Sequence, residues 1–180
     1  MATAGGLKGF IRSYGMFWDR DEVDWSPGSG NARQFRLLGR VGTRSPRLQI
    51  CDFRSQRGIY VLYDVHGACY VGLARAQDIG NRLRAHTRGH LSGEWDRFSW
   101  FGFRRVLTSQ KPDGTRRLGT VPDRLLTNSD ATIGDIEALL IQALGTYRVG
   151  NLQQMRFASA ERWQQVREDE VSHYLSRIVR

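Results

Sequence analysis

The chain has 180 residues, of which 40% are hydrophobic, so it is long enough and apolar enough for one domain with a hydrophobic core. It has no run of roughly eighteen apolar residues, and its N-terminus lacks the charged-then-apolar order of a signal peptide, so we expect a cytoplasmic protein that neither spans a membrane nor is secreted. The formal net charge of +9 favours a polyanionic partner, nucleic acid first, because phosphate contacts release condensed counterions.

Residues 1 to about 50 are predicted to form an N-terminal extension that packs on a main domain of residues 51–180. A turn cluster runs from Ser26 to Asn31, and the segment has too many apolar residues for a disordered tail. Its acidic residues between Asp19 and Asp24 are interspersed with Arg20 and tryptophans. This mixture is more typical of a solvated face than of a metal site.

From Gly58 onward the hydrophobic pattern becomes regular. Residues 59–65 and 68–73 are β-branched and aromatic runs separated by His66-Gly67, which predicts a β-hairpin. A helix is expected to open at Asp78 or at Gly80-Asn81 and to run to about His86. Residues 98–107 return to strand character, and the turn signal at residues 111–114 predicts a second hairpin tip.

The last third of the chain is predicted to be helical. Thr132 and Asp135 fit a capping box that opens a helix to about Tyr147, and residues 158–179 have an amphipathic helical pattern. We therefore expect the α+β class: a small, mainly antiparallel sheet of about three strands flanked by helices, with the N-terminal extension and a C-terminal helix.

The most informative stretch is Gly58-Ile59-Tyr60, followed after nine intervening residues by Tyr70-Val71-Gly72. Downstream stand Arg82 and, four residues later, His86, then Glu137 on the next expected helix and Asn151 beyond it. This pattern resembles the GIY-YIG nuclease family over about residues 57–152, with Val71 in place of isoleucine.

The resemblance implies a metal-dependent endonuclease that hydrolyses phosphodiester bonds of DNA. It implies that Glu137 holds a single Mg²⁺ or Mn²⁺ ion, that Arg82 clamps the scissile phosphate, and that Asn151 positions backbone near the site. Tyr60, Tyr70 or His86 would activate the attacking water, and the sequence does not choose among them. It also leaves open DNA against RNA, the strandedness of the substrate and the oligomeric state.

The residue types fit this chemistry without the family name. Arg82 and His86 are one helical turn apart, and a guanidinium can pair two phosphate oxygens while staying charged. Glu137 shares a helical stripe with Leu140, Ile141 and Leu144, so we expect its carboxylate near an apolar interface, where a metal ion or an arginine must compensate it. A structural salt bridge is the alternative.

Other cations and aromatic residues admit two interpretations. Phosphate contacts are predicted for five arginines, of which Arg84 and Arg88 also fit solvated helix positions: Arg75, Arg84, Arg88, Arg116 and Arg117. The two tyrosines alone are typical strand aromatics, and a zinc site at His86 and His90 is disfavoured because no His-Glu-x-x-His pattern is present.

Two other classes of function compete with a nuclease. One is a catalytically silent nucleic-acid-binding module that retains the nuclease fold. The other is a protein-interaction module that uses Trp95 and Trp100, although we expect these aromatics in strand and core. Cys51 and Cys69 are too few and too far apart for a disulfide framework, and they lack the spacing of a structural zinc site.

Overall fold

We analysed a computed structural model of the chain, which describes residues 9–28, 34–122, 129–144, 157 and 159–178. The strands are β1 (Ser13–Asp19), β2 (Leu38–Val41), β3 (Gln49–Asp52), β4 (Gly58–Asp64), β5 (Gly67–Ala74), β6 (Arg97–Gly102), β7 (Val106–Gln110), β8 (Arg116–Leu118) and β9 (Glu161–Gln165). The helices are α1 (Ile79–His86), α2 (Ser129–Leu144) and α4 (Val171–Leu175), the last preceded by the 3₁₀ turn η1 (Glu168–Glu170).

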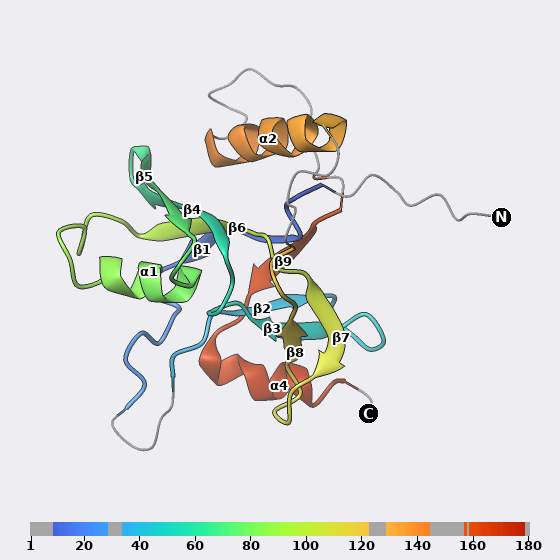
Figure 1. Cartoon of the computed structure of the whole chain (residues 1–180). Coiled ribbons are helices and arrows are strands. Elements are labelled where there is room, and N and C mark those ends of the chain that lie inside the picture. The colour runs from blue at the N-terminus through green and yellow to red at the C-terminus, as the bar shows by residue number, and fades with distance from the viewer. Residues whose placement is uncertain (1–8, 29–33, 123–128, 145–156, 158, 179–180) are drawn as a thin grey trace.

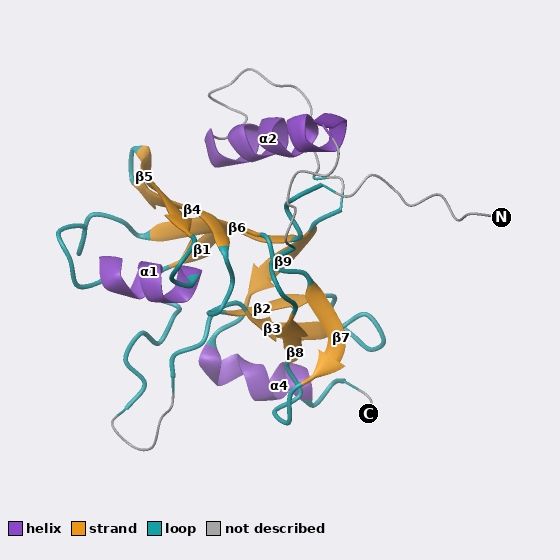
Figure 2. Ribbon diagram, viewed as in Figure 1, coloured by secondary structure: helices purple, strands orange, loops and turns teal. Residues whose placement is uncertain are grey.

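The strands form one nine-stranded mixed sheet in the order β5-β4-β6-β1-β9-β2-β3-β8-β7. Figure 1 shows β5, β4, β6 and β1 on one side and β2, β3, β8 and β7 on the other, with β9 between them. The expected small sheet of about three strands flanked by helices is therefore wrong. The secondary-structure colouring of Figure 2 makes the predominance of strand over helix plain.

Two segments account for the larger sheet. The N-terminal segment supplies β1, β2 and β3, and β1 inserts between β6, to which it is antiparallel, and β9, to which it is parallel. The predicted C-terminal helix is also wrong, because residues 161–165 form β9 and, in the part of the chain that the structure describes, only η1 and the short α4 follow. Trp163 is buried in that strand, since alternation points it inward. In so short a segment, an apolar residue every few positions fits the helical period and the strand period equally well, so the pattern did not distinguish the two.

The predictions for the two hairpins and α1 are confirmed, whereas the single strand expected over residues 98–107 is wrong, because β6 ends at Gly102 and β7 begins at Val106 elsewhere in the sheet. The β4–β5 hairpin is antiparallel, β6 pairs antiparallel with β4, and α1 begins directly after Asp78. The turn at residues 111–114 joins β7 to β8, and the Lys111 N–H donates to the Thr115 carbonyl at 2.7 Å. Helix α2 begins before the predicted Thr132, and Asp135 accepts a hydrogen bond from the Ile11 N–H at 3.0 Å.

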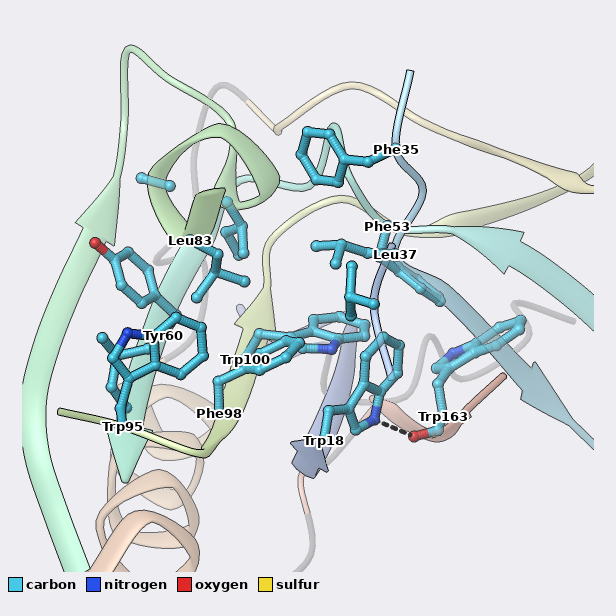
Figure 3. Packing of buried hydrophobic residues seen from close by; sticks show 14 of the residues in the cluster. Trp18, Phe35, Leu37, Phe53, Tyr60, Leu83, Trp95, Phe98, Trp100 and Trp163 are labelled. Carbon is cyan, nitrogen blue, oxygen red and sulfur yellow. Dashed lines mark hydrogen bonds between the residues drawn. The ribbon is translucent and has the colours of Figure 1, made fainter. Parts of the chain in front are cut away.

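The sheet carries a separate apolar cluster on each face near β4. Tyr60 and Leu62 pack with Leu83 of α1 and with Trp100, as Figure 3 shows for Tyr60, Leu83 and Trp100. The alternate residues Val61 and Tyr63 pack in the second cluster, which includes Ala138 and Ala143 of α2. Because alternate strand residues point to opposite faces, α1 and α2 cover opposite faces of this part of the sheet.

A third cluster joins β2 and β3 to α4, through Leu38, Ile50 and Val171 among others. Trp95 and Trp100 are both buried, which confirms that they build the core and removes them from any exposed binding surface. None of the helices in the described ranges has the length and apolarity needed to cross a membrane.

Candidate functional site

The register of the β4–β5 hairpin brings the two motif tyrosines to one face. Tyr60 pairs with Gly72 and Leu62 pairs with Tyr70, and directly paired residues point the same way. The ring of Tyr60 lies across Gly72 so closely that a Cβ at residue 72 would stand 2.1 Å from Cζ of Tyr60. Glycine at this position is what allows the phenol to extend toward the edge strand β5.

The first glycine of the motif has a different steric reason. A Cβ at Gly58 would lie 2.0 Å from the carbonyl oxygen of Phe101 on the adjacent strand β6, and the φ angle of 154° is one that other residues rarely adopt. Gly58 therefore lets β4 and β6 approach each other. The close pairing of β4 with β6 fixes the position from which the Tyr60 side chain projects.

Helix α1 completes the cluster from the same face. Ile79 and Leu83 are buried beneath the helix, and the N–H groups of Ile79 and Gly80 donate to the carbonyls of Gln56 (2.8 Å) and Arg54 (3.0 Å). At the other end, the indole of Trp95 donates to the carbonyl of His86 at 3.4 Å. These contacts fix the position of the helix that carries Arg82 and His86.

Four predicted site residues meet at the Tyr60 hydroxyl. Its oxygen lies 2.8 Å from Nε2 of His86 and accepts a hydrogen bond from Nε of Arg82 at 3.4 Å. Tyr70 joins through its ring, whose centroid lies 4.8 Å from His86 and 6.1 Å from Tyr60. We call these four residues the Tyr60 cluster. In Figure 3 the Tyr60 hydroxyl points away from Trp100.

The surroundings of the cluster define its protonation states. Burial raises the pKa of Tyr60 above its ordinary value, although the hydrogen bond and charge of Arg82 act in the opposite direction. Burial, with the nearby charges of Arg82 and His90, lowers the pKa of His86 below 6.5. The hydrogen bond to Tyr60 raises the pKa of Arg82. At neutral pH the cluster thus combines a neutral phenol, a neutral imidazole and a guanidinium cation.

Glu137 lies on α2 and is exposed, so its predicted position at an apolar interface is wrong. The helix packs inward through Ala131, Asp135 and Ala138, which turns most of the expected stripe outward. Leu140 and Leu144 are 52% and 51% exposed. Within the described chain, Glu137 makes no hydrogen bond or ion pair, and it does not contact the Tyr60 cluster.

The donor chemistry of Glu137 nevertheless fits a divalent cation. Its carboxylate is exposed and unpaired among the described residues, although α2 packs against the face of the sheet opposite to the Tyr60 cluster. Mg²⁺ is often bound by one or two carboxylates, with water and substrate phosphate completing the octahedron. The described residues contain no group of three or more His, Cys, Asp or Glu suited to a metal. Asn151 lies outside the described residues.

The arginines predicted to bind phosphate fall into different settings. Arg75 is exposed at the end of β5, and Arg88 is exposed and donates to the Ser26 hydroxyl at 3.2 Å. Arg84 instead lies over the ring of Phe35, with Cζ 5.2 Å from the ring centroid.

Arg116 and Arg117 lie on β8, near the opposite end of the sheet from β5. Arg116 donates to the carbonyl of Thr108, and Nε of Arg117 donates to the carbonyl of Gln110 at 3.2 Å. Both side chains thus reach from β8 to backbone carbonyls of the neighbouring strand β7.

One positioning residue was missed by sequence analysis. Nε of Arg57, which precedes the motif, lies 2.8 Å from a carboxylate oxygen of Asp78, the residue before α1. The pair therefore links the start of β4 to the start of the helix that carries Arg82 and His86. An arginine beside the first motif glycine and an acid at a helix start were the available signals, but their proximity depends on tertiary structure.

Comparisons of this chain with protein-family models, with curated proteins and with solved structures find no match. Function is therefore inferred from the chemistry of the Tyr60 cluster. It places a permanent cation next to a phenol and an imidazole that is free to accept a proton at neutral pH. This combination suits a reaction in which an anionic substrate is attacked by water.

Proposed function

We propose that this chain is an endonuclease that hydrolyses phosphodiester bonds of DNA at the Tyr60 cluster. The observation that supports it best is the double contact of the Tyr60 hydroxyl, with His86 at 2.8 Å and Arg82 at 3.4 Å. The net charge of +9 favours a phosphate-rich substrate, and we propose a cytoplasmic location for the enzyme.

His86 is the proposed general base. Its lowered pKa keeps the imidazole neutral at pH 7, whereas the raised pKa of Tyr60 opposes formation of a phenolate. A water bound to the Tyr60 oxygen gives its proton to that oxygen as the phenol passes its own proton to Nε2 of His86. The resulting hydroxide attacks phosphorus as the bond to the 3′ oxygen breaks on the opposite side. The leaving 3′ oxygen takes a proton from solvent, and His86 then returns its proton to solvent.

Arg82 is the proposed phosphate clamp. Its Nε is engaged by Tyr60, and its other N–H groups can pair with non-bridging phosphate oxygens as negative charge builds up on them. Tyr70 closes the other side of His86 and limits the orientations of its ring. The cation and the base are thereby held at fixed positions on either side of one phenol.

Glu137 is the proposed ligand of the Mg²⁺ or Mn²⁺ ion. When bound, such an ion would neutralise charge on the phosphoryl oxygens and on the leaving group. Glu137 is exposed, which supports this assignment, although its helix covers the face of the sheet opposite to α1 and the Tyr60 cluster. Its lack of contact with the Tyr60 cluster favours the second candidate function, a silent module that binds nucleic acid without cutting it.

Cleavage assays separate the two functions. Plasmid, single-stranded DNA and RNA are incubated with the full chain in Mg²⁺, Mn²⁺ or EDTA. We expect DNA cleavage that EDTA abolishes, and a loss on the order of 10²- to 10³-fold for Arg82→Ala, because one charge-stabilising donor is removed. Arg47→Ala, an exposed arginine in the β2–β3 turn, is the matched control. Binding without cleavage under all three conditions would establish the silent module.

A further inference from the structure

A basic cavity of about 1040 Å³ opens beside β5, between the end of β6 and the β7–β8 hairpin. Arg57, Arg75, Arg104 and Arg105 line it, and none of the described lining residues is acidic. Of these four, only Arg57 forms an ion pair with a described residue, to Asp78. Among the described residues, Arg75, Arg104 and Arg105 therefore leave an excess of positive charge on the wall, which suits an anionic ligand.

Arg104 is held in place by buried neighbours. Its N–H donates to Oε1 of the fully buried Gln56 at 2.9 Å, and its carbonyl accepts hydrogen bonds from Nε2 of Gln56 at 2.9 Å and the hydroxyl of Ser13 at 3.3 Å. Nε of Arg104 is itself buried, with no hydrogen-bond partner in the described part of the chain. A fixed backbone and an unsatisfied donor are the features of a preorganised site.

Apart from Thr120, the rest of the described wall is apolar. Phe103, Leu107 and Leu118 line it together with Leu73, which is 39% exposed. The ring of Phe103 is itself supported by Phe10, at a centroid distance of 5.9 Å. A simple phosphate ion would need only the arginines, whereas a nucleotide would use both parts, with its base against the aromatic and aliphatic wall and its phosphates against the cations.

The cavity is connected to the Tyr60 cluster through two elements. Gly72 supports the ring of Tyr60, and Ala74, two residues or roughly 7 Å further along β5, lines the cavity. Arg57 lines it as well and pairs with Asp78 at the start of α1. One nucleic-acid strand can therefore contact both places.

We propose that this cavity binds an unpaired nucleotide of a single-stranded nucleic acid. If the proposed nuclease function holds, that nucleotide flanks the scissile phosphate, and the enzyme prefers substrates with an unpaired stretch at the cleavage site. A base held in a duplex cannot enter such a cavity unless it is first unstacked and unpaired, which costs a few kcal/mol.

Fluorescence anisotropy in EDTA measures binding of the full chain without cleavage. The probes are a labelled single strand of about 10 nucleotides, a blunt duplex of the same length, and a 5′-mononucleotide as competitor. We expect the single strand to bind at least about tenfold more tightly than either of the other two, because only it offers both an accessible base and several phosphates.

Charge removal in the cavity tests its location. Arg104→Gln with Arg105→Gln should weaken single-strand binding about tenfold. It should also lower the slope of log K against log[salt] by about 1.4, which corresponds to two phosphate contacts. Arg44→Gln with Arg47→Gln removes the same charge from the exposed β2–β3 turn and should change affinity less than about twofold. Phe103→Leu should weaken the single strand more than the duplex, since it removes a stacking surface. Melting curves verify that each variant is folded.

The proposal is overturned if the duplex or the mononucleotide binds as tightly as the single strand, or if the cavity and turn variants weaken binding equally. Its outcome is independent of catalysis, because no cleavage is measured. Single-strand binding without any cleavage would leave the cavity assignment standing while the nuclease function fails. If the wild-type protein cleaves DNA and its cavity variants bind the single strand normally, the nuclease function stands and the cavity assignment fails.

Discussion

The β4–β5 hairpin with α1 holds four polar side chains in mutual contact, whereas α2 leaves Glu137 exposed and without a partner among the described residues. The hairpin and α1 are consecutive in the chain, so short connections and backbone pairing fix their geometry. Helix α2 lies more than 40 residues after α1 and is held mainly by small side chains such as Ala138 and Ala143. Local elements thus define the Tyr60 cluster, whereas tertiary packing places the carboxylate of Glu137 on the opposite face of the sheet.

The largest expected effect tests whether α2 belongs to the site. Glu137→Gln should reduce cleavage on the order of 10³-fold, because an ion worth several kcal/mol of charge stabilisation is lost. DNA binding should be unchanged or slightly tighter, since a negative charge is removed. Glu22→Gln, an exposed acid in the N-terminal segment, serves as the control. Metal-dependent cleavage at the wild-type rate by Glu137→Gln would remove α2 from the mechanism.

The next effect tests the packing of the hairpin. Gly72→Ala places a methyl group 2.1 Å from Cζ of Tyr60, so we expect a loss of about 1–3 kcal/mol in the free energy of unfolding from overpacking. We also expect a fall of about 10²-fold in cleavage at temperatures where the variant is folded, because Tyr60 must move away from His86 and Arg82. Gly28→Ala, where an added Cβ would meet no atom of the other described residues within 4 Å apart from its chain neighbours, is the control for both measurements. Normal cleavage by folded Gly72→Ala would show that the position of Tyr60 does not matter.

These two regions also show what a sequence can and cannot predict. The hairpin, α1 and the face shared by Tyr60, Arg82 and His86 follow from local patterns, and the structure confirms their grouping. Strand β1 was missed because its partners, β6 and β9, are distant in the chain, and pairing across such distances leaves no local signal. The burial predicted for Glu137 failed because the helical period gives the relative positions of residues around a helix, whereas contacts such as Asp135 with Ile11 select the inward side.

The pH dependence of cleavage is the third effect and identifies the base within the hairpin–α1 unit. The lowered pKa of His86 means that kcat/KM should rise about tenfold per pH unit well below 6.5 and should be level from pH 7 to 9. With Tyr60 as the base, the rise would instead continue toward pH 10 and beyond, because the pKa of Tyr60 is raised. Rates measured from pH 5 to 10 at constant ionic strength distinguish the two.

The smallest effect lies within α1 and its C-terminal extension. Arg84 is stacked on Phe35, so Arg84→Gln should change DNA affinity less than about twofold and cost about 0.5–1 kcal/mol of stability through the lost cation–π contact. Among the described residues, the exposed Arg88 has only the Ser26 hydroxyl as a partner. Arg88→Gln should therefore lower the slope of log K against log[salt] for DNA binding by the equivalent of about one phosphate contact. Equal effects of the two substitutions on binding would contradict their different surroundings.

The joint action of Tyr60 and His86 is tested most directly by a double-mutant cycle in single-turnover cleavage. Tyr60→Phe removes the hydroxyl that lies 2.8 Å from His86, and His86→Gln removes the proposed base. Two groups that transfer one proton together should be strongly non-additive, so we expect the double variant to cleave about as slowly as the slower single variant. Independent effects that multiply in the double variant would show that the two side chains are neighbours without a shared function.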